Sequence, residues 1–325
     1  MRRAFFSLTL ALALAGCGET ILTTPTPTAP QPPPHDLPRI PPAFAESLVA
    51  KRKVDGLKIR VYNTGLIVTN GHNVSNMKST ESRVRLPVPV FLIKHPKKGY
   101  VLFDTGIGPS SGEKSDCLRE PVEVKPGQDI LSQLRADRVD PGQVAYVILS
   151  HLHREHAAAV TSFPSATVIV DRREWQEQKA KQAAERDSSE LDPNALEPAL
   201  RLMPIDLTPE PHFGAFDHGF DLFGDGTIVL VDLSGHTAGS MGAWINLDSG
   251  PVLLAGDATW LLDNHQDRAI PKESFISDVE KYWRRIYAMR AMQEAATSLV
   301  IYPGHDLTPL ALQPRADVSE IYFAR

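Results

Sequence analysis

Apolar residues recur along the chain in short runs that are separated by glycine, proline and charged residues. These runs either alternate with polar residues or are apolar throughout, which is typical of strands that are half or fully buried in a sheet. They lie at residues 58–68, 88–94, 100–103, 144–149 and 167–170, and later at 228–233, 251–255 and 299–302. The pattern therefore predicts two sets of apolar strands, one early and one late in the chain.

Helical periodicity occurs in three places between these runs. In the segment 277–297, apolar residues recur at the i, i+3, i+4, i+7 spacing of one buried helix face. They are Val279, Tyr282, Trp283, Ile286, Met289 and Met292. Shorter helices are predicted at 130–136 and at 171–186, whereas the polar, proline-interrupted segment 188–211 predicts an irregular excursion over the surface. Strands and helices that alternate in this way predict an α/β fold.

A cluster of histidines follows the apolar run at 144–149. His151, His153 and His156, with Glu155 among them, leave the end of a predicted strand within one short turn. Neutral imidazole suits zinc and other borderline metals, and a carboxylate oxygen completes such sites. The alternative is a solvated histidine-rich loop, which is disfavoured because crowded histidines repel one another when they are protonated.

Three further candidate ligands each follow a later apolar run. His236, Asp257 and His305 stand directly after a glycine at the end of a predicted strand. A sheet behind such residues holds them in place, and the glycine lets the backbone approach a metal closely. A single histidine or aspartate at a strand end is more often a turn former or a cap. Four such places, all after strands, favour a metal centre instead.

The order and separation of these residues resemble the ligand pattern of the metallo-β-lactamase superfamily of metal hydrolases. That family has His-x-His-x-Asp-His, then a lone His, then Asp, then His. The corresponding positions here are His151, His153, Glu155, His156, His236, Asp257 and His305. Leu102-Phe-Asp-Thr-Gly106 is similar to the family's early strand and turn, and the resemblance extends from about Leu57 to the C-terminus. It implies the family's fold, a four-layer αβ/βα sandwich.

The resemblance also implies two zinc ions per chain. The implied ligands of the first ion are His151, His153 and His236, those of the second are Glu155, His156 and His305, and Asp257 bridges the two. Each ion lowers the pKa of a shared water to about 7, so that a bridging hydroxide can attack a carbonyl at neutral pH. No serine or cysteine nucleophile is then required.

Within the superfamily, several stretches are most similar to the N-acyl homoserine lactone lactonases, which act in quorum quenching. They are 87–93, 148–153 and 163–170, the last running on into Glu174-Trp175. This similarity implies that the substrate is a small molecule, an acyl homoserine lactone or a related lactone or ester.

Two positions depart from the lactonase pattern. Glu155 stands where the family has Asp, and its extra methylene is expected to weaken the second metal site or to require a shift of the loop. The lactonases usually carry Tyr three residues after the bridging Asp, whereas Trp260 follows Asp257 here. An indole N–H donates a hydrogen bond but cannot accept one or titrate. Asp257, Glu155 and Trp260 are the residues predicted to take part in catalysis.

Other functions remain open at this point. A phosphodiesterase or a sulfatase of the same fold is possible because a hydroxide held by two metals suits those esters too. A β-lactamase of this fold is a third possible function. However, the β-lactamases that use a cysteine as a metal ligand have that Cys at the position of Asp257. A function of a different class is also possible. The chain could be a non-catalytic surface lipoprotein with a degenerate metal site, in which Glu155 is the substitution that impairs metal binding.

The N-terminus predicts export and lipidation. A basic start is followed by an apolar stretch, 4–15, that is too short to span a bilayer. Leu14-Ala-Gly-Cys17 resembles the lipobox of a bacterial lipoprotein, the alternative being an ordinary secretory signal. We therefore predict a signal peptide at 1–16, a Pro/Thr-rich spacer at 17–45 and a hydrolase domain at 46–325. A lipid on Cys17 would anchor the protein in the cell envelope, on the periplasmic or outer-membrane side.

The composition limits the classes of partner that the protein can bind. The net charge of −5, with both signs interspersed, argues against a nucleic-acid surface. Besides Cys17 the chain has one cysteine, Cys117, so an acylated Cys17 leaves no intramolecular disulfide. The domain must therefore depend on its hydrophobic core, and the sequence leaves its oligomeric state undecided.

Overall fold

The computed structural model describes residue 40 and residues 55–108, 119–185 and 191–321, all of which fall in one compact unit, 32–325. The predicted signal peptide, Cys17, Cys117 and all of the spacer except Ile40 lie outside the described residues, so these assignments stay predictions. Among the described residues, no helix has the length and apolarity to cross a membrane.

The first of two sheets in the described chain combines antiparallel and parallel strands. Its order is β13 (Val318–Ile321), β1 (Lys58–Asn70), β2 (Arg83–His95), β3 (Gly99–Phe103), β5 (Val144–Ile148), β6 (Thr167–Asp171) and β7 (Arg201–Ile205), with β4 (Val122–Glu123) paired to β1. The pairs β1–β2 and β2–β3 are antiparallel, whereas β3, β5, β6 and β7 run parallel. The carboxyl ends of β3 and β5 therefore meet at the same edge of the sheet.

The second sheet is built from the later strands. Its order is β12 (Val300–Tyr302), β11 (Gly250–Leu254), β10 (Met241–Leu247), β9 (Ile228–Asp232) and β8 (Gly219–Asp221). β10 is antiparallel to both β9 and β11, and β12 is parallel to β11. Consequently β9, β11 and β12 all run in one direction, and the residues after them emerge at one edge.

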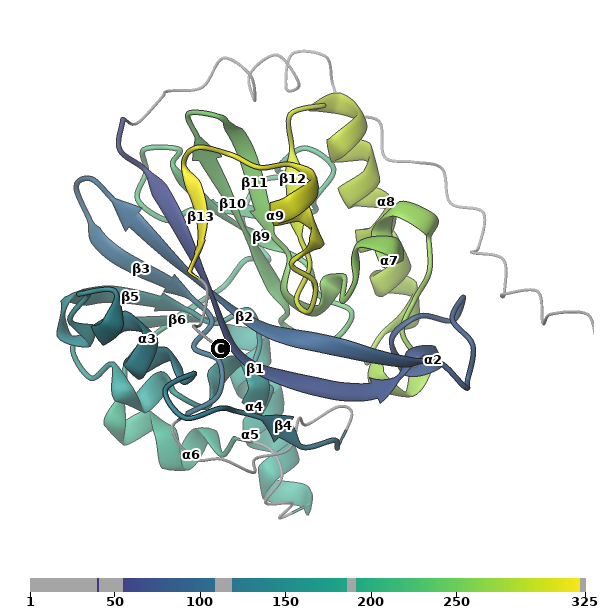
Figure 1. Cartoon of the computed structure of the whole chain (residues 1–325), viewed down its shortest axis with the longest axis horizontal. Coiled ribbons are helices and arrows are strands. Elements are labelled where there is room, and N and C mark those ends of the chain that lie inside the picture. The colour runs from purple at the N-terminus through teal and green to yellow at the C-terminus, as the bar shows by residue number, and fades with distance from the viewer. Residues whose placement is uncertain (1–39, 41–54, 109–118, 186–190, 322–325) are drawn as a thin grey trace, which may run out of the picture. The chain divides into compact units, whose positions relative to one another are not determined.

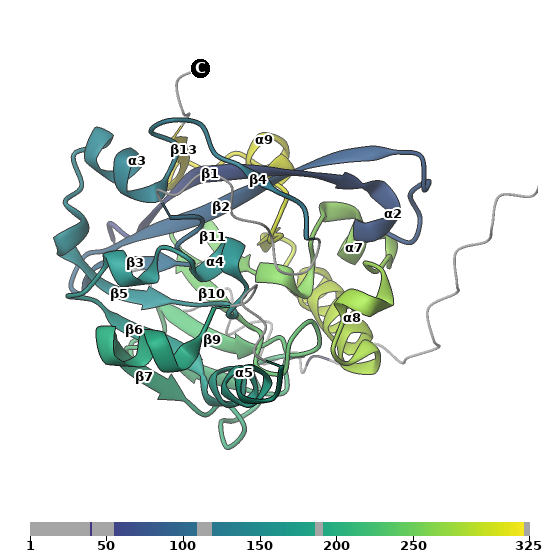
Figure 2. The same ribbon diagram turned by 90° about the horizontal axis from the view of Figure 1, so that it is seen from below.

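Helices cover the outer faces of the two sheets, as Figures 1 and 2 show. The helices are α2 (Gly71–Val74), α3 (Ile130–Ala136), α4 (Arg154–Ala157), α5 (Arg172–Glu185), α6 (Pro193–Leu196), α7 (Leu262–Asp267), α8 (Val279–Ala295) and α9 (Thr308–Leu312). Residues of α3, α4 and α5 share a core cluster with the first sheet, and residues of α8 share one with the second. A third cluster fills the space between the sheets. These three clusters define the four layers of an αβ/βα sandwich, as predicted.

Strand β9 shows why the strands of the two middle layers are continuous apolar runs in the sequence. Val229 and Val231 belong to the cluster beneath α8, whereas Ile228 and Leu230 belong to the cluster between the sheets. Successive side chains point to opposite faces of a strand. Because both faces are covered here, both sets of positions are apolar rather than alternating with polar residues.

Most predicted elements are present within a few residues of their expected bounds. The helix predicted at 130–136 is α3, and the long apolar stripe at 277–297 is α8, whose Tyr282 and Ile286 are fully buried. The irregular excursion predicted for 188–211 is wrong in part. Its described residues include α6 and also β7, which pairs with β6 in parallel. The pattern of apolar residues did not predict β7, because β7 is an edge strand that is mostly half-buried and carries Pro204.

The layer between the sheets sets the stability of the domain. We expect Leu230→Ala to lower the free energy of unfolding by about 2–5 kcal/mol, because it leaves a cavity between two sheets that cannot collapse freely. Leu312→Ala is the matched control, since Leu312 is 63% exposed and its truncation should change stability by no more than about 0.5 kcal/mol. Urea denaturation of both variants measures the difference. Equal effects would contradict the assignment of this layer as the core.

Candidate metal centre

All seven predicted metal ligands converge where the two sheets bring their strand ends together. The loop after β5 carries His151 and His153, and α4 carries Glu155 and His156. The remaining three follow β9, β11 and β12, which end at one edge of the second sheet: His236, Asp257 and His305. Six of the seven side chains are buried, and His153 is half-buried.

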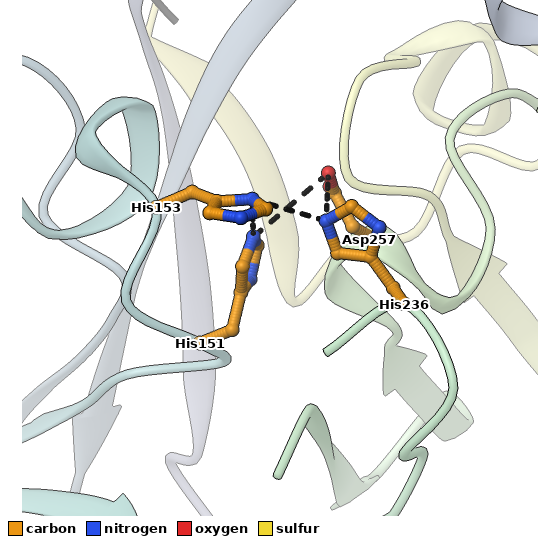
Figure 3. A group of neighbouring side chains, drawn as sticks. All are labelled: His151, His153, His236 and Asp257. Carbon is orange, nitrogen blue, oxygen red and sulfur yellow. Dashed lines mark hydrogen bonds and ion pairs between the residues drawn. The ribbon is translucent and has the colours of Figure 1, made fainter. Parts of the chain in front are cut away.

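The first group consists of His151, His153, His236 and Asp257, whose ligand atoms lie within 4.8 Å of one another. Nδ1 of His153 lies 2.9 Å from Nε2 of His151 and 3.1 Å from Nε2 of His236. Oδ2 of Asp257 lies 3.4 Å from Nε2 of His236 and 3.9 Å from Nε2 of His151. In Figure 3 the ring nitrogens and the carboxylate oxygen point into one small space.

The second group consists of Glu155, His156 and His305, again within 4.8 Å. The other oxygen of Asp257, Oδ1, faces this group, at 3.3 Å from Nε2 of His156 and 3.4 Å from Nε2 of His305. One carboxylate therefore turns one oxygen to each group. The longer side chain of Glu155 does not exclude it from the second group.

Residues behind the histidines orient the rings. The distal nitrogens of His151, His156 and His305 lie 2.9–3.0 Å from an oxygen of Ser150, Asp104 and Pro87. A partner of this kind fixes the tautomer and the ring orientation of a metal-binding histidine.

Asp104 is the functional residue that the sequence analysis did not identify. Besides facing His156, its carboxylate accepts hydrogen bonds from the backbone N–H and the hydroxyl of Ser150. Its backbone is in the left-handed region, with φ of 61°. The available signal was its place in Asp104-Thr-Gly106 at the end of β3, next to the end of β5 in the sheet.

Burial keeps most of these imidazoles neutral. It is the largest cause that lowers the pKa of His153 and of His236 to about 3, and it holds the pKa of His151 well below its usual value. A neutral imidazole has the free lone pair that a metal requires, so these three rings can bind a cation without first losing a proton.

His156 and Asp257 behave as a charged pair in the protein alone. Burial lowers the pKa of His156, but the carboxylates of Asp257 and Asp104 outweigh it and raise that pKa well above its usual value. Burial would raise the pKa of Asp257, but His305 and His156 together hold it well below its usual range. A metal ion bound here would replace the proton on His156, so its affinity should fall at low pH.

The chemistry of the donor set fits metal ions. Asp257 is 1% exposed, and among the described residues neither of its oxygens has a hydrogen bond of normal geometry, although four imidazole nitrogens lie 3.3–3.9 Å away. Nε2 of His156 is likewise buried without a hydrogen-bond partner in the described chain. Buried polar atoms without partners are rare because each one carries a desolvation penalty of about 1–3 kcal/mol. Cations between Asp257 and the two histidine groups would satisfy all of these atoms at once.

Close backbone packing supports the position of Asp257. A Cβ atom on Gly304 would overlap Oδ1 of Asp257, so only glycine fits immediately before His305. The prediction that glycine lets the chain approach the site is therefore met at Gly304.

Trp260 covers one side of the two groups. Its ring lies edge-on to the rings of His236 and His305, with centroid distances of 5.6 Å and 5.9 Å. The same ring stacks on Phe275. The side chain is 1% exposed, and its Nε1 has no hydrogen-bond partner within the described residues. Trp260 therefore brings one unused N–H donor to the site.

A groove of about 420 Å³ adjoins the second group at His305. Its apolar lining comes from Val84, Pro87, Leu261 and Leu262, and its polar lining includes Lys78, Arg85, Asp263 and Asp306. Lys78 and Asp263 form an ion pair of 2.7 Å, which partly neutralises the rim. The groove is thus amphiphilic and ends beside a candidate ligand.

Comparison with known proteins agrees with this geometry. The profile of the Metallo-beta-lactamase superfamily matches residues 83–305. The N-acyl homoserine lactonase AttM of Azorhizobium caulinodans is 30% identical over 262 residues, covering 76% of this chain and 93% of the relative. The N-acyl homoserine lactonase AiiA of Bacillus thuringiensis subsp. kurstaki is 24% identical over 260 residues, covering 77% and 93%.

Solved structures share the fold. The B. thuringiensis AiiA structure with N-decanoyl-L-homoserine bound at its active site has a TM-score of 0.63 and 22% identity, covering 78% of this chain and 95% of that chain. AidC, described as a dizinc quorum-quenching lactonase, has a TM-score of 0.53 and 17% identity, covering 83% and 92%. Because the superfamily profile spans more than half of the sequence, the chain belongs to the metallo-beta-lactamase superfamily and is a metal-dependent hydrolase.

Proposed function

We propose that this hydrolase opens the ring of N-acyl homoserine lactones or closely related lactones. The observation that carries the proposal is the placement of Asp257, whose two oxygens each face a separate set of ligand atoms. Similarity to named lactonases over three quarters of the chain supports the substrate class. A site built for two metals suits this reaction, because attack and departure of an oxygen both need charge stabilisation.

In this proposal the residues of each ligand group would hold one zinc ion, and Asp257 would be available to both because one of its oxygens faces each group. When bound, such ions polarise a carbonyl, lower the pKa of a coordinated water and stabilise a leaving oxygen. The chain's own residues keep these positions fixed: Asp104 and the Pro87 carbonyl orient His156 and His305, and the buried ring of Trp260 excludes bulk water from that side.

Two side chains are proposed to act directly on the substrate. Ring opening adds a water oxygen to the lactone carbonyl carbon and breaks the ring C–O bond, which leaves an alkoxide that must take up a proton. Glu155 is the second carboxyl in the site, and we assign it to take the proton released by the attacking water and to pass that same proton to the leaving oxygen. The unused N–H of Trp260 donates to a substrate oxygen, the task that a tyrosine hydroxyl would otherwise perform.

The amphiphilic groove beside His305 is proposed to hold the acyl part of the substrate. Its apolar lining suits a hydrocarbon chain, and its polar rim suits an amide. The groove gives this site a means to discriminate acyl-chain length.

Removal of the shared carboxylate tests the proposed chemistry. We expect Asp257→Ala, reconstituted with zinc, to lose about 1000-fold or more of kcat/KM for hexanoyl homoserine lactone, because both ligand groups lose a common member. Asp248→Asn, on an exposed residue away from the site, is the control. Acid release measures ring opening, and a chromogenic cephalosporin and a phosphodiester are assayed in parallel. Turnover of either alternative substrate, with none of the lactone, would overturn the proposed substrate class.

Glu155→Asp tests whether the family's usual residue would serve better. The placement of Glu155 within the second group favours a loop that is matched to its length. Shortening the side chain withdraws the carboxylate by about 1.5 Å, so we expect the second zinc to bind about tenfold more weakly and turnover to fall. Isothermal titration with zinc measures the affinity. Tighter binding with faster turnover would instead mean that Glu155 weakens this site.

A charge in the groove tests where the acyl chain lies. We expect Leu262→Asp to raise KM about tenfold for decanoyl homoserine lactone, while KM for the butanoyl compound changes by less than about twofold, since only the long chain reaches the groove wall. Leu312→Asp, at an exposed leucine outside the groove, is the matched control. Equal changes for both chain lengths would exclude the groove as the acyl site.

A further inference from the structure

A buried glutamate outside both ligand groups connects the loops of the first group. Glu174 lies in the first turn of α5 and is 4% exposed. Oε1 accepts a hydrogen bond of 3.0 Å from the backbone N–H of Leu152, and Oε2 accepts one of 3.1 Å from that of Gly239. Both oxygens are therefore engaged by backbone donors from two different loops.

Those two loops carry the three histidines of the first group. Leu152 stands between His151 and His153, in the loop that follows β5 of the first sheet. Gly239 is three residues after His236, in the turn that follows β9 of the second sheet. A single carboxylate thus links loops that belong to different sheets.

The contact between the second loop and α5 is close. A Cβ atom on Gly239 would overlap the backbone N of Glu174, so the loop lies directly against the start of the helix. Glu174 itself is held by the helix, and its carboxylate cannot shift away from either loop without losing a hydrogen bond. This one side chain therefore restrains the separation of the two loops.

The second group is supported in another way. His156 is backed by Asp104 and His305 by the Pro87 carbonyl. Within the described residues, the two backbone donors to Glu174 are Leu152 and Gly239, neither of which belongs to that group. Asp104 also reaches the first group, since it accepts hydrogen bonds from Ser150, whose hydroxyl lies 3.0 Å from Nδ1 of His151. Glu174, in contrast, accepts its two backbone hydrogen bonds from the loops that carry the histidines of the first group.

We propose that Glu174 is a positioning residue that fixes the spacing of His151 and His153 relative to His236, and thereby sets the affinity and geometry of the first metal site. This inference rests on the proposed two-metal function. Partners of this kind, one step removed from the metal, typically alter metal affinity about 10- to 100-fold when they are changed.

Cobalt binding to the metal-free full-length protein tests the inference, with Co²⁺ alone as the probe and its visible absorption as the reporter of ligand geometry. Glu174→Gln keeps the side-chain shape but turns an NH₂ group toward one of the two backbone N–H donors. We expect one of two Co²⁺ ions to bind at least about tenfold more weakly, with an altered spectrum. Glu177→Gln, on the same helix, is the control and should retain both ions and the native spectrum.

His305→Ala identifies which ion is affected. This variant removes a ligand of the second group and should weaken the other ion, so the spectral components lost in Glu174→Gln and in His305→Ala should differ. Amide hydrogen exchange at Leu152 and Gly239 should accelerate in Glu174→Gln only, which separates a local effect from unfolding. Native affinity and spectrum in Glu174→Gln, beside two bound ions in the unaltered protein, would overturn the inference and leave the proposed function standing. Failure of the unaltered protein to bind Co²⁺ would overturn both.

Discussion

The Asp257 carboxylate lies in the interior among the Nε2 atoms of four histidines, at 3.3–3.9 Å from each. A buried charge is strongly unfavourable unless it is paired, and a carboxylate without hydrogen-bond donors is more so. This carboxylate lies where loops from both sheets meet. The arrangement is understandable if cations fill the space between Asp257 and the two histidine groups, because each oxygen then gains a ligand bond.

The supporting residues follow from the same constraint. Imidazole rings can share a cation only if their nitrogens point inward, so their distal nitrogens need partners of their own. These partners are the Pro87 carbonyl in β2, Asp104 directly after β3, and Ser150 in the loop after β5. Glu174 supports the backbone of the loops rather than the rings. Preorganisation of this site is therefore distributed over strands, loops and the start of a helix.

The two departures from the lactonase pattern have different structural outcomes. Glu155 remains with His156 and His305, so the longer acid is accommodated in the ligand group. Trp260 lies between His236 and His305 and packs with the hydrophobic cluster at the end of the β1–β2 hairpin. It fills its position with a large, rigid ring and a single N–H donor. Neither departure therefore prevents the assembly of the site.

Local patterns in the chain were enough to predict the strand sets, α3, α8 and all seven candidate ligands, because buried strands and strand-end ligands leave signals within a few neighbouring residues. The four-layer arrangement came from the family resemblance, since periodicity alone gives no strand order. β7 was missed because an edge strand interrupted by proline lacks the apolar run of a central one. Asp104 and Glu174 received no role for a related reason. An acid becomes a support only through partners that here are 22 to 65 residues away in the chain, and such distant contacts leave no local pattern. Pairing of β3 with β5, and packing of α5 against the loop after β9, brought these partners together.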